Sequence, residues 1–524
     1  MTNQNQEREQ HHHHYSKEDN NVNLMLPSAR REDGAKQPCI KIWKFDLRIP
    51  FVHYEWEIPE MIQALVVFMT GSAATAYLQD LFGFSFEVAL SIIFVHELLY
   101  MVNNTLGDAL IGGWITPAVP LITAFLLNYE PGPERAYALV GMELMLGLMY
   151  VILGATGIAN KLIDICPLSL KAGILIGSGF AACAGPYGFK SLADGGKGFF
   201  MYPIAWSIGC TLGIFLLFSN GFGKVKFGSK NKAIKLLTKA GFVPAIIVAG
   251  VVGMITGECA LPDFSGVTSF WFNPIPGLTW VWKNFSILGV GIPPLEILAK
   301  DLPMAIMCYV IAFGDIVGGT AFLHDTKRYR QDEYIDISPD RTNMCCGFRN
   351  LIEAFFSPTC TMSGPLWSAM TVSVAERYKT GKENMYSIFG GSCTFNTTKW
   401  ICQLIVPLMA LIRPILPLAM AQTLIIQAFG SFYVGMNMAR TNVERGVAGI
   451  TAGAIAICAN PSYGLFVGIV LCIFIEMINM NREERRANVE EGIEIYVNSM
   501  KEELADIRAK DAEHDAKKLA KASR

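Results

Sequence analysis

The stretch Gly314-Asp-Ile-Val-Gly-Gly-Thr320 places one carboxylate inside a long apolar segment. A charged group in a membrane-spanning segment is costly and marks a functional site by default. An isolated carboxylate there is either protonated or paired with a cation. We therefore predict that Asp315 and Thr320 bind a coupling cation, sodium or a proton, and that Gly319 permits close approach of a helix or ligand. The alternative is a small-residue packing face in which Asp315 is a helix cap.

Two Gly/Pro-rich stretches combine hydroxyl side chains with backbone that interrupts a helix. They are Gly112-Gly-Trp-Ile-Thr-Pro-Ala-Val-Pro120 and Ser357-Pro-Thr-Cys-Thr-Met-Ser-Gly-Pro-Leu-Trp367. Each predicts an extended segment that leads into a short helix. Either one alone would also suit an ordinary helix kinked by proline.

Short interrupted segments at matching positions of two halves indicate the binding site of a transporter. We therefore expect the site between the segments 114–127 and 359–376. The residues predicted to contact the substrate are Thr116, Pro117, Thr361, Ser363 and Gly364. Glu353 lies about one helical turn before the break at Pro358 and is a further possible contact.

The elements that must position these residues are membrane helices. The chain has 524 residues, of which 52% are hydrophobic and 17% charged, and a mean hydropathy of +0.34. The polar residues gather in 1–60 and 481–524, which leaves a long apolar region between them. At roughly 30 residues per span and connection, that region predicts an all-α polytopic membrane protein with about 14 transmembrane segments. This excludes a soluble enzyme and a receptor with one anchor, and the spans carry no nucleophile–base pair or metal-ligand set.

The predicted spans divide into two halves of about seven each, and an odd repeat unit makes the second copy insert upside down. We therefore predict an inverted repeat. The predicted spans are 61–79, 86–106, 114–127, 133–157, 166–184, 199–219, 243–257, 302–324, 343–357, 363–376, 384–406, 413–432, 446–460 and 463–480. The predicted regions are a polar N-terminal tail with an interfacial segment (1–60), a first repeat (61–257), a connector (258–301), a second repeat (302–480) and a charged helical tail (481–524).

The basic residues predict the orientation of the chain. Loops expected to face the cytoplasm hold most of them, including the lysines between Lys224 and Lys239. By the positive-inside rule, both termini are cytoplasmic in the plasma or inner membrane. The net charge of −2 gives no indication of nucleic-acid binding. The run His11–His14 is either a metal-binding tract or incidental.

The motif around Asp315 resembles the eighth-helix motif of the purine branch of the nucleobase:cation symporters. The stretch Pro358–Pro365 resembles the short strand and half-helix of the tenth span in the same fold, which sulfate permeases and bicarbonate transporters share. The resemblance covers residues 61–480. It implies a core domain and a gate domain, a site between the third and tenth half-helices, and a homodimer.

One departure from that pattern bears on the substrate. Nucleobase symporters usually carry a glutamate at the tenth half-helix, whereas this chain has Thr361-Met-Ser-Gly-Pro365. Hydroxyls beside two helix N-termini suit an anion, because the N-termini present free N–H groups and positive dipole ends. We therefore predict a cation-coupled secondary active transporter, a symporter of a small anion with an elevator-type movement and no cofactor. The alternatives are a nucleobase symporter of the purine or uracil type and, from another class, a channel or a non-transporting membrane scaffold.

Overall fold

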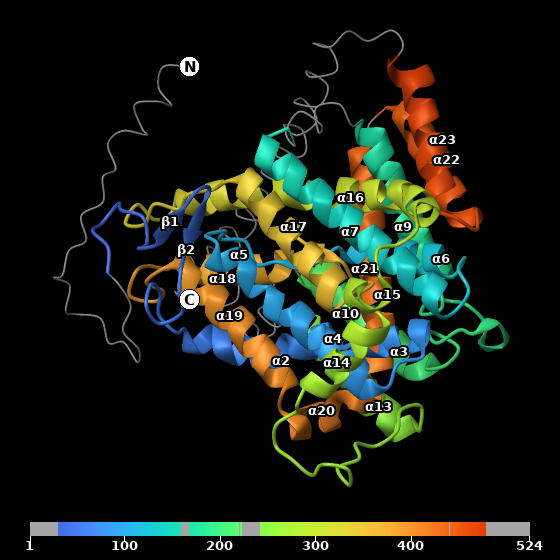
Figure 1. Cartoon of the computed structure of the whole chain (residues 1–524), viewed down its shortest axis with the longest axis horizontal. Coiled ribbons are helices and arrows are strands. Elements are labelled where there is room, and N and C mark those ends of the chain that lie inside the picture. Colours follow the sequence, from blue (N-terminus) through green and yellow to red (C-terminus); the bar gives the residue numbers. More distant parts are fainter. Residues whose placement is uncertain (1–29, 159–166, 220, 223–241, 440, 478–524) are drawn as a thin grey trace, which may run out of the picture. The chain divides into compact units, whose positions relative to one another are not determined.

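The computed structural model describes residues 30–158, 167–219, 221–222, 242–439 and 441–477 (Figure 1). The described chain is mostly helical, as the apolar composition predicts. The His11–His14 run, the lysines 224–239 and the predicted tail 481–524 lie outside the described residues.

The helices follow the predicted order along the chain. Those before residue 260 are α2 (Ile58–Ser72), α3 (Ala74–Phe82), α4 (Phe86–Leu99), α5 (Met101–Thr105), η1 (Thr116–Ala118), α6 (Val119–Leu126), α7 (Pro133–Thr156), α9 (Leu168–Ala184), η2 (Leu192–Asp194), α10 (Pro203–Phe218) and α13 (Val243–Thr256). Those after it are α14 (Ile275–Asn284), α15 (Ile287–Val290), α16 (Leu295–Lys327), α17 (Pro339–Phe356), α18 (Ser368–Tyr378), α19 (Ile388–Gln403), α20 (Val406–Ile412), η3 (Arg413–Ile415), α21 (Leu416–Met438), α22 (Asn442–Ile457), α23 (Ser462–Leu471) and the π-helical turn η4 (Cys472–Met477).

Two small antiparallel sheets accompany the helices of the predicted all-α fold. The hairpin of β1 (Ile40–Ile42) and β2 (Phe45–Leu47) occupies part of the segment predicted to be interfacial. The second sheet pairs β3 (Gly113–Trp114) with β4 (Ser363–Gly364), which lie far apart in the sequence. Both pairs are too short to show the alternating hydrophobic pattern from which strands are predicted.

Five helical segments of the described chain are long and apolar enough to cross a membrane. They are Ile58–Phe82, Phe86–Thr105, Pro133–Thr156, Leu295–His324 and Val406–Met438. Shorter apolar helices fall at five more of the predicted spans: Thr116–Leu126, Leu168–Ala184, Pro203–Phe218, Val243–Thr256 and Ser462–Ile475. The helices support an integral multi-pass membrane protein, while the count of about 14 spans stays a prediction.

The chain forms two compact units, and each draws on both halves of the sequence. Unit 1 comprises Met1–Ala159 and Ala260–Met420, and unit 2 comprises Asn160–Cys259 and Ala421–Arg524. Unit 1 therefore contains both interrupted segments, together with Asp315 and Glu353. All the predicted site residues belong to this one unit.

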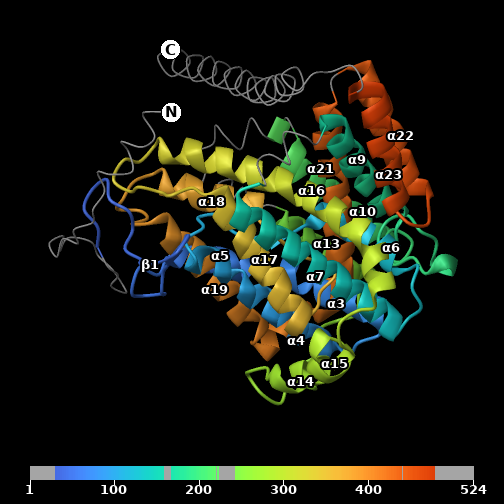
Figure 2. The same cartoon turned by 45° about the horizontal axis from the view of Figure 1, so that its top comes forward.

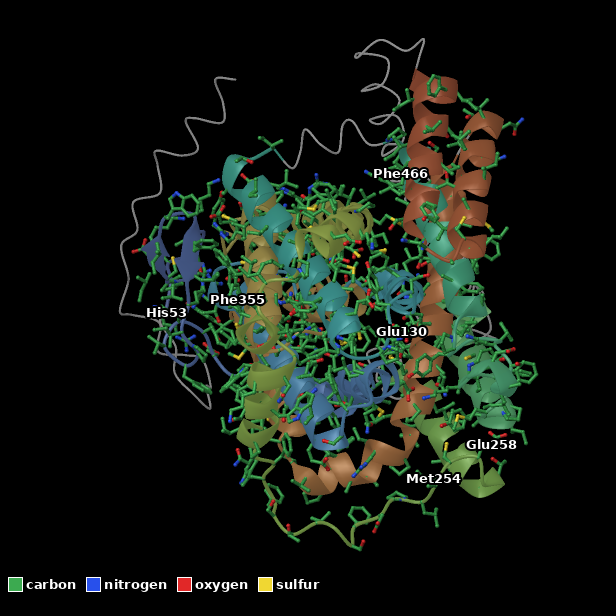
Figure 3. All side chains as sticks on the ribbon, turned by 45° about the vertical axis from the view of Figure 1, so that its right-hand side comes forward. His53, Glu130, Met254, Glu258, Phe355 and Phe466 are labelled. Carbon is green, nitrogen blue, oxygen red and sulfur yellow. The ribbon has the colours of Figure 1, made fainter. Side chains whose placement is uncertain are left out.

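Large apolar side chains remain exposed on both units, as expected of helices that face lipid. On α17 of unit 1, Phe355 is 39% exposed, and on α23 of unit 2, Phe466 is 53% exposed (Figure 3). Ile255 of α13 and Ile457 of α22 are more than three-quarters exposed. Soluble proteins rarely expose large contiguous apolar patches, so these side chains agree with a membrane environment.

Close packing of α7 against α17 organises the interior of unit 1, where the two helices run side by side (Figure 2). A Cβ atom added at Gly147 would lie 2.9 Å from the Leu351 side chain, and one added at Gly347 would lie 2.5 Å from Val151. The two helices are thus antiparallel, and glycine lets their backbones approach closely.

Candidate functional site

Pairing of β3 with β4 brings the two interrupted segments together. Gly113 lies opposite Gly364, and Trp114 opposite Ser363. The pairing continues on both sides, because Ile115 N–H donates to Met362 O at 3.2 Å and Trp367 N–H donates to Ile111 O at 2.6 Å. The two stretches predicted separately from the sequence therefore form one structure.

The strands pair closely only because small residues face each other. A Cβ atom added at Gly364 would lie 3.0 Å from Trp114 O, and one added at Gly113 would lie 3.1 Å from Leu366 O. Met362, next to the strand pair, has φ = 48°, which is uncommon for a residue other than glycine. Gly364, predicted to contact the substrate, thus packs closely against the backbone of β3.

A short helical segment begins directly after each strand. After β3, Thr116 and Pro117 open η1, which continues into α6, and Thr116 is half-buried. After β4, α18 begins at the exposed residue Ser368, and its N-cap residue Trp367 makes no side-chain cap hydrogen bond. The first N–H groups of a helix have no partner within the helix and carry its positive dipole end. The start of α18 therefore offers free N–H groups near the strand pair, whereas at η1 Pro117 has no N–H and the N–H groups of Ala118 and Val119 donate to Ile115 O and Thr116 O.

Arg349 of α17 lies fully buried beneath the strand pair and contacts both strands. Its Nη1 donates to Gly364 O at 2.9 Å and to Asn103 Oδ1 at 3.2 Å, and its Nη2 donates to Gly113 O at 3.4 Å. Its Nε is buried without a hydrogen-bond partner. Within the described residues, no carboxylate forms an ion pair with Arg349, and the guanidinium instead stacks on the Tyr100 ring, 4.5 Å from its centroid. Neutral oxygen acceptors and an aromatic ring thus hold the guanidinium at the strand pair.

A second buried cation, Lys399 of α19, lies beside the start of α18. Its ammonium group is 4.4 Å from the centroid of the Trp367 ring and 4.0 Å from that of Tyr100. It forms an ion pair with Glu97 of α4, and both side chains are fully buried. A buried pair of this kind holds two helices in a defined arrangement, and breaking it leaves an unpaired charge.

The hydroxyls predicted to contact the substrate point into a buried polar network. Ser363 Oγ donates to Glu353 Oε1 at 2.7 Å, and Thr361 Oγ1 lies 3.3 Å from His96 Nε2. The His96 Nδ1 atom lies 2.8 Å from Glu353 Oε1, and its Nε2 lies 2.9 Å from the Tyr100 hydroxyl. Both hydroxyls are therefore engaged with other side chains of the protein.

Asp315 lies on α16, which packs against η1 and α18. Its neighbour Gly319 is close to Leu110 and Leu366, the residues that flank the strands, since a Cβ atom added there would lie 2.9 Å from Leu110. Asp315 and Thr320 are half-buried, and no hydrogen bond to another described residue involves their side chains.

Arg349 and Lys399 were not predicted as part of the site. Both lie within predicted spans, 343–357 and 384–406, so the signal that identified Asp315 applied to them equally. Their importance depends on the strand pair, which places residues from four distant segments side by side. Spacing along the sequence cannot reveal that arrangement.

Comparisons with known proteins find solved structures that are similar to this one but no matching sequence family. No family model and no curated protein matches the chain. The structure is similar to murine Solute Carrier 26 family member A9, an anion transporter in the inward-facing state, with a TM-score of 0.47 and 13% identity, covering 81% of this chain and 69% of that one. It is also similar to the transmembrane domain of the cyanobacterial bicarbonate transporter BicA (TM-score 0.45, 13% identity, 80% and 95% coverage). A second structure of SLC26A9 gives a TM-score of 0.43 at 12% identity, covering 79% of this chain and 64% of that one.

Proposed function

We propose that the protein is a membrane transporter that binds a small anion at the β3–β4 pair. The observation that supports this most is the pairing itself, which places the start of α18, an N-terminal helix end without a side-chain cap, close to the other interrupted segment. Such ends bind anions through free N–H groups and the helix dipole.

The charges around the strand pair favour the same class of substrate. The guanidinium of Arg349 donates to neutral oxygen acceptors and stacks on an aromatic ring, with no ion pair to a carboxylate among the described residues. A buried charge without a partner is costly, and a bound anion would offset that cost. The pair of Lys399 and Glu97 contributes no net charge, so Arg349 is the cation at the strands that an anion could pair with.

We propose further that transport is coupled to a cation at Asp315 and that unit 1 carries the site as one body in an elevator-type cycle. The half-buried carboxylate on α16 supports the first point, and the confinement of the whole site to one compact unit supports the second. The cation would bind first, because it removes a negative charge that repels the anion. The homodimer implied by the sequence resemblance belongs to the same proposal.

Uptake into proteoliposomes tests this function. The purified chain is reconstituted and offered radiolabelled chloride, bicarbonate, sulfate, uracil and adenine, with and without a sodium or proton gradient. We expect saturable uptake of at least one anion, and accumulation above equilibrium only with a gradient. Saturable uptake of a nucleobase without anion uptake would instead establish the alternative that the motif at 314–320 favours. Linear, unsaturable ion flux would indicate a channel.

A further inference from the structure

Two buried glutamates meet where α7 packs against α17. The antiparallel register set by Gly147 and Gly347 places Glu143 of α7 opposite Glu353 of α17. A hydrogen-bonding contact joins their carboxyl groups, and both side chains are completely buried. The glycine-mediated approach of the two backbones therefore forces two acids into one site.

The hydrogen bonds of this pair are incomplete as long as both groups are ionised. Glu143 Oε1 accepts from Thr359 N–H at 3.4 Å, and Glu353 Oε1 accepts from the Ser363 hydroxyl. The other oxygen of each group, Oε2, is buried without a donor. An ionised carboxylate only accepts hydrogen bonds, whereas a protonated one also donates. A single proton on either acid would let one oxygen donate to the other and relieve the repulsion of two negative charges.

Titratable groups from several elements lie around the pair, and α16, which packs on α7, adds Asp315 near Cys346 and Tyr150. From α4, His96 contacts Glu353 directly and Tyr100 lies behind it. The segment before β4 adds Thr361 and the thiol of Cys360 near Glu143. The thiol of Cys346, on α17 itself, lies near Glu353.

The charged groups nearest to these are already engaged. Arg349, one helical turn before Glu353, contacts backbone oxygens of the strands, and Lys399 pairs with Glu97. No arginine or lysine among the described residues forms an ion pair with Glu143 or Glu353. Within the same part of the chain, no set of three or more His, Cys, Asp or Glu side chains could hold a metal ion. Among the described residues, no cationic side chain therefore offsets the charge of the two acids.

We propose that Glu143 and Glu353 form a binding site for one exchangeable proton, separate from Asp315. The proton adds to a carboxylate oxygen and leaves the reverse way, with no other bond changed. Glu353 connects the pair to the strands, because its Oε1 accepts from Ser363 of β4. Protonation removes one negative charge close to the strand pair, so a bound proton raises the affinity for an anion. This coupling rests on the proposed anion site, whereas the proton site itself does not.

Infrared spectroscopy of the purified full-length protein tests the proton site without any transport. A protonated, buried carboxyl group gives a C=O stretching band that shifts in D₂O. We expect this band in the wild type and in Asp315→Asn, and its loss in both Glu143→Gln and Glu353→Gln. The glutamine variants keep the shape of the side chain and supply an N–H donor, so the fold is retained. A band that persists in both glutamine variants would overturn the proposal.

The coupling is measured as the pH dependence of sulfate and chloride affinity, since both anions stay ionised over the range used. The wild-type affinity should rise as the pH falls, and Glu143→Gln should show no such rise. An infrared band that appears only after sodium is removed would overturn the proposal in favour of a cation site. If no anion binds while the band behaves as expected, the proposed function fails and the proton site stands.

Discussion

Buried charges are the residues on which the site depends, and they differ in how visible they are in the sequence. Asp315 interrupts a strongly apolar stretch and is easily singled out, whereas Arg349 and Glu353 share a helix with other polar residues. The sequence shows that such groups are costly in a membrane, and only the fold shows which of them meet. Of the predicted substrate hydroxyls, Ser363 and Thr361 are turned towards Glu353 and His96, which no local pattern indicates.

Because Lys399 and Glu97 form an ion pair, we predict that the effects of their substitutions on the free energy of unfolding are not additive. Lys399→Met or Glu97→Gln alone should lower the free energy of unfolding by about 3–5 kcal/mol, because each leaves one buried charge unpaired. The double variant removes both charges and should lie close to the wild type. Thermal denaturation of the purified protein followed by circular dichroism measures the cycle. Additive losses in the double variant would show that the two residues do not act as a pair.

We predict that substitution of Asp315 abolishes the coupling of transport to a cation gradient and leaves the fold intact. Asp315→Asn keeps the size of the side chain but cannot hold a cation by charge, so accumulation driven by a gradient should disappear. The circular dichroism spectrum and the elution volume should match the wild type, since no described residue bonds to this carboxylate. Glu296→Gln, an exposed acid on the same helix, is the matched control. Unchanged sodium or proton dependence in Asp315→Asn would place the coupling cation elsewhere.

At the scale of the elements, most helices follow from the apolar pattern, and the strand pair follows only in part. The Gly/Pro stretches predict extended backbone before α6 and α18, as the structure has it. Their pairing is a contact between residues about 250 positions apart, which periodicity along the chain cannot indicate. The hairpin of β1 and β2 was missed for a related reason, because its three-residue strands are too short for a pattern.

Substitution of Gly364 should separate the strands. Gly364→Val adds a branched side chain where Trp114 O and Ile115 already lie within 3.0 Å of an added Cβ atom. We expect at least a tenfold loss of anion affinity, which corresponds to about 1.4 kcal/mol. Gly314→Ala on α16 is the control, because nothing lies within 4 Å of its added Cβ atom. Isothermal titration of both variants measures the difference, and equal affinities would remove the strand pair from the site.

We predict that acid lowers the stability of unit 1 by protonating carboxyl groups that form ion pairs with the N-terminal segment. Asp336, in the connection between α16 and α17, forms ion pairs with Lys36 at 2.8 Å and Arg341 at 2.7 Å. Burial alone would raise the pKa of Asp336, but these two cations outweigh it and hold the pKa well below its usual range. Asp46 of β2 behaves in the same way beside Lys36, and its pKa is also lowered. A carboxyl group with a lowered pKa stabilises the fold above its unfolded pKa, about 3.9, and loses this contribution as the pH falls through its folded pKa.

Thermal melting between about pH 7 and about pH 3 tests this prediction, with most of the loss below the unfolded pKa of about 3.9. The melting temperature of the wild type should fall at the acid end. Asp336→Asn should melt lower than the wild type at neutral pH and lose less on acidification, so that the two curves converge. Asp33→Asn, an exposed acid in the same segment, should follow the wild-type curve. Parallel curves for Asp336→Asn and the wild type would contradict the assignment.

For the whole molecule, the sequence predicts two successive repeats, and the structure forms compact units that draw on both. The predicted boundary at 258–301 falls where the chain returns to unit 1, because that unit resumes at Ala260. The chain passes from unit 1 to unit 2 near Ala159 and again near Met420, and no feature of the sequence predicts these two boundaries. Apolar runs define the helices, whereas the assignment of helices to units depends on contacts between distant parts of the chain.

The most direct test of the central claim, an anion site at the start of α18, is the affinity of Ser368→Glu for sulfate and chloride. Ser368 is exposed and opens the helix, so a carboxylate there would occupy the positive helix end without disturbing the core. The account predicts at least a tenfold weaker anion affinity by isothermal titration, about 1.4 kcal/mol, with Ser368→Gln close to the wild type. Unchanged anion affinity in Ser368→Glu, or tighter binding of uracil or adenine, would contradict it.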